Sequence, residues 1–214
     1  MKKWNYFRIL NFKMIDYINQ DPVAFGIVAG SLEEEGIRVA FGESLIAPNG
    51  EVDFERVVVL KPDAFYNTKD FATPPKSPDG IVVVKNDDKI YIYIAELKSS
   101  PLKNIKKRDI IEKFDTIFSR FLIDDFKHIF MEFDYDLKNL SLWLVCDPTN
   151  IRSSVDDPDA RARKIKARGA LKGVLTEFVS SFKPYTFRGI TSFVVPMVSP
   201  PTIECDHFTD CLAE

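Results

Sequence analysis

The stretch PDGIVVVKNDDKIYIYIAELK, residues 78–98, decides the fold and opens the functional argument. Its two apolar segments, Ile81–Val84 and Lys89–Leu97, are rich in β-branched and aromatic side chains. The polar run Asn86-Asp87-Asp88 between them is typical of a tight turn. Both faces of each segment are apolar, as expected of interior strands. The stretch therefore predicts a β-hairpin buried inside a sheet.

The length of the hairpin tip determines which residues face each other. With a two-residue turn at Asp87-Asp88, counting back along both strands places Asp79 directly opposite Glu96. Directly opposed residues have Cβ atoms about 4.5–5.5 Å apart. Side chains alternate with period two, so Lys98 shares the face of Glu96. A four-residue tip keeps this register, whereas an odd-length tip sends Glu96 to the opposite face.

Asp79 and Glu96 form a pair of carboxylates that repel each other unless a cation lies between them. Hard oxygen ligands suit Mg²⁺ or Mn²⁺. A lysine beside the pair, here Lys98, can orient a water and offset charge on a phosphate. The alternative is a solvated acidic pair with Lys98 as its salt-bridge partner. The preceding apolar strand, the matching register of Pro78-Asp79 and the long loop ahead favour metal-assisted hydrolysis of a phosphodiester.

The elements around the hairpin predict an α/β fold. Apolar spacing predicts helices over residues 4–20 and 23–35, the second ending at Gly36, and a helix through Ile110 to Phe121. Strands are expected over residues 37–46, 52–60, 140–146 and 192–198, with a long loop over 61–80 and a helix from Asp157 to about Phe182. This order predicts a central mixed β-sheet flanked by helices. No linker divides residues 1–214, so we expect one domain, with residues 200–214 as a peripheral tail.

The bulk properties limit the class of protein. The chain has 214 residues, a formal net charge of -3 and three cysteines without disulfide-like spacing. The slight acidity argues against a protein that coats nucleic acid non-specifically. Residues 1–13 are basic and aromatic without an apolar run of signal-peptide length, and no apolar run of the sequence has the length of a membrane span. We therefore expect a cytoplasmic protein that does not enter a membrane.

The pattern Pro78-Asp79, a hairpin, then Glu96-Leu97-Lys98 resembles the PD-(D/E)xK nuclease superfamily, whose members share a restriction-endonuclease-like core. The flanking order of helices and strands is similar over most of residues 1–198. The resemblance implies a Mg²⁺-dependent endonuclease, with Mn²⁺ as an alternative metal, that cuts DNA. A type II restriction endonuclease working as a homodimer is the first expectation. The alternatives are a repair or mobile-element nuclease, and a non-catalytic nucleic-acid-binding or assembly module on the same fold.

The resemblance also implies roles for individual residues. Asp79, Glu96 and the backbone carbonyl of Leu97 would hold the metal, and Lys98 would position the attacking water. Many members add an acidic residue from the first helix, which here would be Glu34 or Glu35. Further alternatives are Glu33 and Glu43 for this acid, and Asp63 in place of Asp79.

Two basic clusters are candidates for contact with phosphates. The first follows directly after the Glu-Leu-Lys strand and includes Lys103, Lys106 and Lys107. The second lies in a stretch without acidic residues between Ala160 and Thr176, and it includes Arg161, Lys164, Arg168 and Lys172. On a helix the last three form one stripe at four-residue spacing, which suits a phosphate backbone. An ordinary solvated helix face is the alternative for this second cluster.

Overall fold

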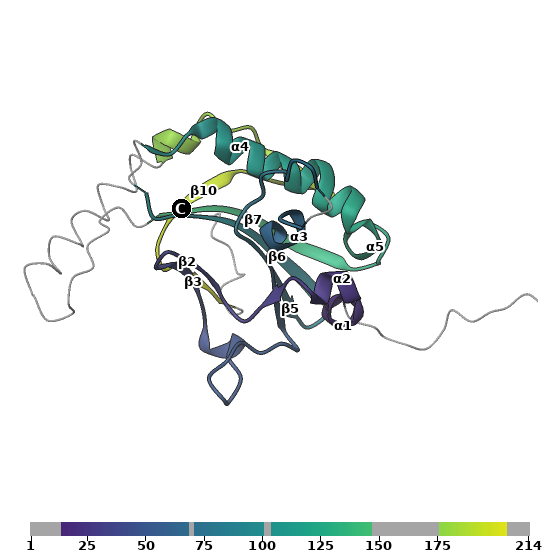
Figure 1. Ribbon diagram of the computed structural model, residues 1–214. Coiled ribbons are helices and arrows are strands. Elements are labelled where there is room, and N and C mark those ends of the chain that lie inside the picture. Colours follow the sequence, from purple (N-terminus) through teal and green to yellow (C-terminus); the bar gives the residue numbers. More distant parts are fainter. Residues whose placement is uncertain (1–13, 69–70, 101–103, 147–175, 205–214) are drawn as a thin grey trace, which may run out of the picture.

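The central feature of the computed structural model is a six-stranded sheet (Figure 1). The model describes residues 14–68, 71–100, 104–146 and 176–204. The strands lie in the order β1 (Val28–Ala29), β4 (Val57–Leu60), β5 (Gly80–Asn86), β6 (Lys89–Lys98), β7 (Asp136–Cys146) and β10 (Val194–Val198). In this sheet β1, β4, β5 and β6 pair antiparallel with their neighbours in that order, whereas β7 is parallel to both β6 and β10. The predicted α/β fold with a central mixed sheet is confirmed.

The hairpin of β5 and β6 has the predicted register. Asn86 pairs with Lys89 across a two-residue tip, and Ile81 pairs with Ile94 further along. Val82 lies opposite Tyr93 on the other face, a favourable β-branched–aromatic pair. Both strands are buried along most of their length, because β4 and β7 pair with their outer edges and an apolar cluster covers each face. The even register carries Asp79 and Glu96 to the same end of the hairpin.

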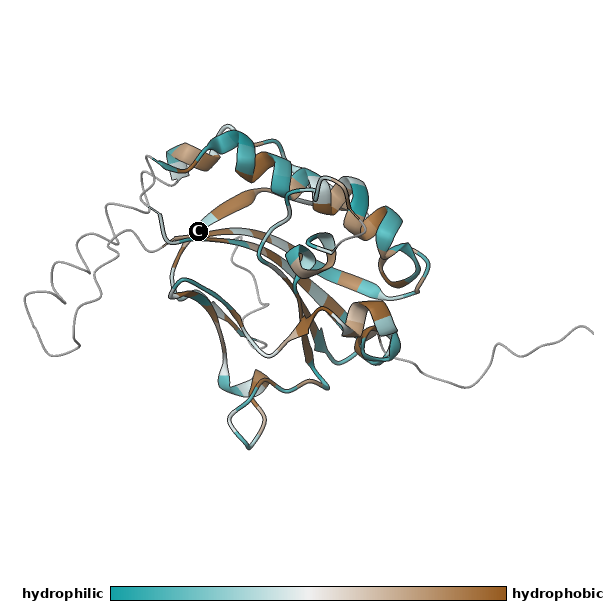
Figure 2. Cartoon of the chain, in the orientation of Figure 1, coloured by the Kyte–Doolittle hydropathy of each residue, from teal (hydrophilic) through white to brown (hydrophobic). Residues whose placement is uncertain are grey.

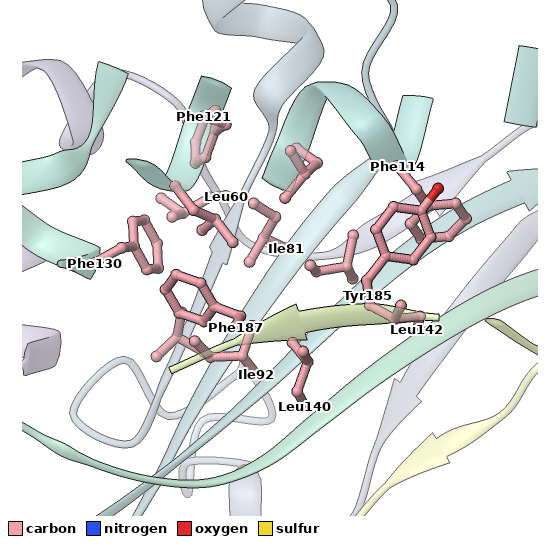
Figure 3. Close-up of a cluster of buried hydrophobic side chains, with 14 of the residues drawn as sticks. Leu60, Ile81, Ile92, Phe114, Phe121, Phe130, Leu140, Leu142, Tyr185 and Phe187 are labelled. Carbon is pink, nitrogen blue, oxygen red and sulfur yellow. The ribbon is translucent and has the colours of Figure 1, made fainter. Parts of the chain in front are cut away.

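Helices cover one face of the sheet. They are α1 (Met14–Gln20), α2 (Pro22–Phe25), α3 (Pro62–Tyr66), α4 (Lys107–Thr116), the π-helical segment η3 (Ile117–Asp125) and α5 (Lys127–Phe130). Along α4, hydrophilic and hydrophobic residues alternate in the hydropathy colouring, and the apolar Ile110 and Phe114 are buried (Figure 2). Phenylalanine rings from α4, η3 and α5 pack on Ile81, Ile92 and Leu142 of the strands (Figure 3). This burial of large rings is the main source of stability on this face.

The other face of the sheet carries a smaller, three-stranded sheet. Its order is β11 (Thr202–Ile203), β3 (Ile37–Phe41) and β2 (Leu32–Glu34), and the 3-10 helix η1 (Glu43–Leu45) follows β3. Leu32, Val39 and Ile203 are buried in a second apolar cluster with Val82, Tyr93 and other residues of the central sheet. The hairpin β5–β6 is therefore enclosed between helices and a second sheet.

The predicted helix over residues 23–35 is wrong beyond its first turn. Only Pro22–Phe25 is helical, and β2 and β3 form a hairpin in which Glu34 pairs with Ile37. The two turn residues, Glu35 and Gly36, have φ of 48° and 82°. Positive φ at both positions is the type I′ turn that suits a two-residue hairpin, and glycine favours it at the second position. The glycine interpreted as a helix end is therefore a hairpin turn.

Other boundaries also differ from the prediction. The predicted strands over 37–46 and 52–60 are shorter and lie in different sheets, as β3 and β4. The expected long loop contains the short helix α3. The last predicted strand, over 192–198, corresponds to β10, and a separate hairpin of β8 (Tyr185–Phe187) and β9 (Ile190–Ser192) comes before it. Of the helix predicted from Asp157 to about Phe182, residues 176–182 are described, and only residues 176–179 of these are helical.

The expectation of a peripheral tail after Pro200 is wrong for residues 200–204. Strand β11 pairs with β3, and the side chain of Ile203 is buried against the second apolar cluster. Residues 205–214 lie outside the described part of the chain. Among the described residues, none of the helices is both long and apolar enough to cross a membrane.

Candidate active site

Asp79 and Glu96 meet on the helix-covered face, where β5 begins and β6 approaches its end. Asp79 directly precedes β5, and its Oδ2 accepts a hydrogen bond of 2.5 Å from the N–H of Leu97. The exposed fraction is 7% for Asp79 and 0% for Glu96. The two carboxylates thus lie at the same end of the hairpin, as its register predicted, and both are largely removed from water.

The backbone of Leu97 points toward the same edge. Within a strand, the N–H and C=O of one residue face the same neighbour, so the Leu97 carbonyl is also directed to the Asp79 side of β6. The pairing of β5 with β6 ends at Gly80 and Ala95, and Pro78 precedes the aspartate whose side chain accepts from Leu97. Proline has no N–H, so Pro78 cannot donate to the Leu97 carbonyl. The proline before Asp79 therefore leaves that oxygen suited to another ligand.

Two lysines form ion pairs with the Glu96 carboxylate. Lys98, two residues along the same strand face, places Nζ 2.5 Å from Glu96 Oε1. Lys113 of α4 places its Nζ 2.7 Å from the same oxygen and 3.6 Å from Asp79 Oδ1. The other oxygen of Glu96, Oε2, is buried without a hydrogen-bond partner among the described residues.

Lys113 was not predicted as a site residue. It directly precedes Phe114 and follows Ile110 by three positions, so helical spacing places it at the border of the buried face of α4. That position was a usable signal, because a lysine beside a buried stripe must extend to a partner or to water. The sequence does not reveal which end of the hairpin this helix crosses.

Glu34 is the acidic residue that joins the pair. It forms a side-chain hydrogen bond to Asp79, which requires a proton on one of the two carboxyls. Partial burial, then this bond and the charge of Asp79, raise the pKa of Glu34, although its side chain retains access to water. Strand β2 supplies Glu34, so the prediction of a residue from the first helix is wrong in its element.

Leu32 explains how Glu34 reaches Asp79. Leu32 and Glu34 share one side of β2, and Leu32 lies on Gly80, where an added Cβ would be 2.4 Å from Leu32 Cδ1. Only glycine lets β2 approach this closely. The packing therefore brings β2 to the residue next to Asp79.

The other acidic candidates do not join Asp79 and Glu96. Glu35 lies in the β2–β3 turn and accepts a hydrogen bond from Ser99 Oγ. Glu33 alternates to the opposite side of β2 from Glu34, and Glu43 begins η1. Asp63 lies in α3, and its Oδ1 is buried without a partner among the described residues.

The electrostatics follow from burial and charge. Burial, followed by the charge of Asp79, raises the pKa of Glu96 to about 7 despite the two lysines. Burial lowers the pKa of Lys98, but the neighbouring Glu96 carboxylate outweighs it, so the net pKa is raised. Burial also raises the pKa of Cys146, which pairs with Lys98 across β6 and β7, to about 12. That thiol stays protonated, which leaves carboxylates and ammonium groups as the reactive set.

The basic clusters are only partly described. Lys106 and Lys107 are exposed at the start of α4, and Lys107 Nζ lies 3.1 Å from Ser181 Oγ and 5.2 Å from the Phe178 ring centroid. Lys103, Arg161, Lys164, Arg168 and Lys172 lie outside the described residues.

The donor set suits a hard divalent cation in its chemistry. Carboxylate oxygens, a directed backbone carbonyl and a buried Glu96 oxygen without a partner are typical ligands of Mg²⁺. In the described ranges, however, no three Asp, Glu, His or Cys side chains stand ready to hold a metal ion. The bridging ammonium of Lys113 gives a physical reason, since it lies on both carboxylates.

Comparison with known proteins adds no relative. No family model matches the chain, and neither a curated protein nor a solved structure matches it.

Proposed function

We propose that this chain is a Mg²⁺-dependent endonuclease that hydrolyses phosphodiester bonds in DNA, with a type II restriction endonuclease acting as a homodimer as the first form to test. The observation that carries the proposal is the convergence of Asp79, Glu96 and Lys98 at one end of a buried hairpin. Glu34 and the directed Leu97 carbonyl extend the same arrangement. Burying several charges is costly, and a purely structural role would not require it.

In this proposal, Asp79, Glu96 and the Leu97 carbonyl hold the metal, as does Glu34 directly or through water. When bound, Mg²⁺ supplies positive charge that stabilises the phosphate transition state and activates a water. Lys98 orients the attacking water with its ammonium group and offsets the charge that develops on the phosphate oxygens. Its contact with Glu96 fixes the direction of that ammonium group.

The competing class is a non-catalytic nucleic-acid-binding or assembly module. A cleavage assay separates the two classes. Plasmid and phage DNA are incubated with the protein in Mg²⁺, in Mn²⁺ and in EDTA, beside Lys98→Met and Lys127→Met. Lys127 is an exposed lysine of α5 that pairs with Glu132, so its loss removes a positive charge away from the site.

We expect metal-dependent cleavage by the wild type and by Lys127→Met. Lys98→Met should lose about 10²–10⁴-fold in rate, the usual contribution of a positioned proton-transfer group. Discrete fragments would support a restriction endonuclease, and a smear would support a non-specific nuclease. Absence of cleavage in every metal, from well-folded protein, would overturn the nuclease proposal in favour of a binding module.

A further inference from the structure

We propose that Lys113 is a built-in counter-cation for the carboxylate pair, and that a metal must displace it in order to bind. The inference rests on the proposed metal site at Asp79 and Glu96, and it goes further by assigning a regulator of metal affinity to α4. Lys113 lies on both carboxylates, with Nζ 2.7 Å from Glu96 Oε1 and 3.6 Å from Asp79 Oδ1. No part of the sequence motif predicted this residue.

The carboxylate pair needs a cation in the folded protein. Asp79 is 7% exposed and Glu96 is fully buried, so water does little to screen their repulsion. The ammonium of Lys113 supplies the missing charge between them. Lys98 forms an ion pair with Glu96 from the same strand, whereas Lys113 forms ion pairs with both acids from helix α4, which covers this face of the sheet.

A metal and this ammonium cannot occupy the same place. A divalent ion held by both carboxylates lies about 2.0–2.6 Å from their oxygens, which is the space that Nζ of Lys113 now fills. Two cations at that separation repel strongly in a buried site. Each metal-binding event therefore carries the cost of removing Lys113 from two ion pairs.

The lysine can leave without disturbing the fold. Its flexible four-carbon stem allows the ammonium to swing while the backbone of α4 stays in place. Ile110 and Phe114, with exposed fractions of 1% and 0%, anchor the helix on either side of it. The side chain of Lys113 itself is 18% exposed, so a path to solvent exists. The ammonium group of Lys113 can therefore move while helix α4 stays in place.

The test is calorimetric titration of the metal-free full-length protein with Mn²⁺ and with Mg²⁺. Lys113→Met removes the competing charge and keeps the apolar stem, while Lys113→Arg keeps a cation on the helix. Lys127→Met controls for the general loss of one positive charge, since Lys127 pairs with Glu132 on α5. Circular dichroism and urea unfolding verify that each variant is folded.

We expect Lys113→Met to bind metal at least about tenfold more tightly than the wild type, which corresponds to about 1.4 kcal/mol. It should also be less stable than the wild type without metal and gain more stability when Mn²⁺ is added. Lys113→Arg and Lys127→Met should remain within about twofold of the wild type. Metal binding by the variant alone would also support the competition.

Two other outcomes overturn the inference in different ways. If the folded Lys113→Met protein binds metal with the wild-type affinity or more weakly, the lysine does not compete, while the proposed nuclease stands. If neither protein binds a metal, the proposed metal-dependent function fails and the counter-cation role fails with it.

Discussion

The two carboxylate oxygens of Glu96 have different surroundings. One oxygen receives two ammonium groups, whereas the other is buried without a partner among the described residues. Burial and the nearby Asp79 raise the pKa of this carboxyl to about 7. A divalent cation that replaces Lys113 would also give this oxygen a partner and stabilise the ionised carboxylate, so the proton would no longer be needed.

Metal affinity should increase with pH up to and beyond neutrality. The pKa of Glu96 in the folded protein, about 7, exceeds the ordinary value of 4.5, so the folded state holds this proton more tightly than the unfolded state. Without metal, the contribution of Glu96 to stability therefore decreases as pH increases from about 4.5 through about 7. Metal requires the ionised form, so binding should release protons below neutrality.

Titration calorimetry in buffers of different ionisation enthalpy measures this release. We expect more protons released per Mn²⁺ bound at about pH 6 than at about pH 8, and tighter binding at the higher pH. An affinity that does not change across this range would mean that Glu96 is not a ligand.

Glu34→Gln should reduce cleavage about tenfold or more, because it removes the third carboxylate from the cluster at Asp79. Glu33→Gln is the matched control, since Glu33 is the exposed neighbour on the opposite side of β2. Cleavage rates at saturating Mg²⁺ compare the two, and Glu33→Gln should change the rate less than twofold. Equal effects of both substitutions would remove Glu34 from the site.

At the scale of elements, the approach of β2 to β5 depends on one glycine. Gly80→Ala places a Cβ against the buried Leu32. Either β2 must then move away from β5, or the Leu32 side chain must change its position. We expect a loss of about 1–3 kcal/mol in the free energy of unfolding, the usual cost of overpacking. Urea unfolding measures it.

Gly30→Ala provides the control for Gly80→Ala. A Cβ on Gly30 meets no atom within 4 Å, so the change in stability should stay within about 0.5 kcal/mol. Cleavage by Gly80→Ala should also decline, because Glu34 moves with β2. Unchanged stability and cleavage in that variant would show that Leu32 adapts without moving the strand.

The hairpin β5–β6 was predictable because a period-two pattern and a short polar tip determine its register locally. The β2–β3 hairpin was not, since Glu33-Glu34-Glu35-Gly36 is also a plausible helix end, and long-range packing of Leu32 on Gly80 decides the outcome. Lys113 was missed for a related reason. Its spacing on the helix was readable, but the direction in which α4 crosses the sheet depends on tertiary contacts.

At the scale of the whole molecule, β11 joins distant parts of the chain. The N–H groups of Ala40 and Gly42 donate to the carbonyls of Pro201 and Ile203, and Ser199 Oγ accepts from the N–H of Arg38. The small sheet that presents Glu34 is therefore held on one side by residues 199–203. A loss of stability in this sheet should therefore also displace Glu34 from the candidate site.

Ile203→Ala should lower the free energy of unfolding by about 2–5 kcal/mol, because it opens a cavity in the second apolar cluster. Thr202→Ala is the control, since Thr202 is the exposed neighbour on the same strand. Thermal and urea unfolding compare the variants. A loss below about 0.5 kcal/mol for Ile203→Ala would mean that β11 contributes little to holding β3.

The pairing of β11 with β3 also has a consequence for biosynthesis. A ribosome adds residues 199–203 long after Asp79, Glu96 and Lys98 have emerged, so the strand that fastens β3, and through it Glu34, is made late. Folding that depends on such distant segments must wait for the later one. For the proposed nuclease, an unfinished chain would contain Asp79, Glu96 and Lys98 without Glu34 fixed beside them. Late assembly would then protect the cell from cleavage by incomplete copies of the protein.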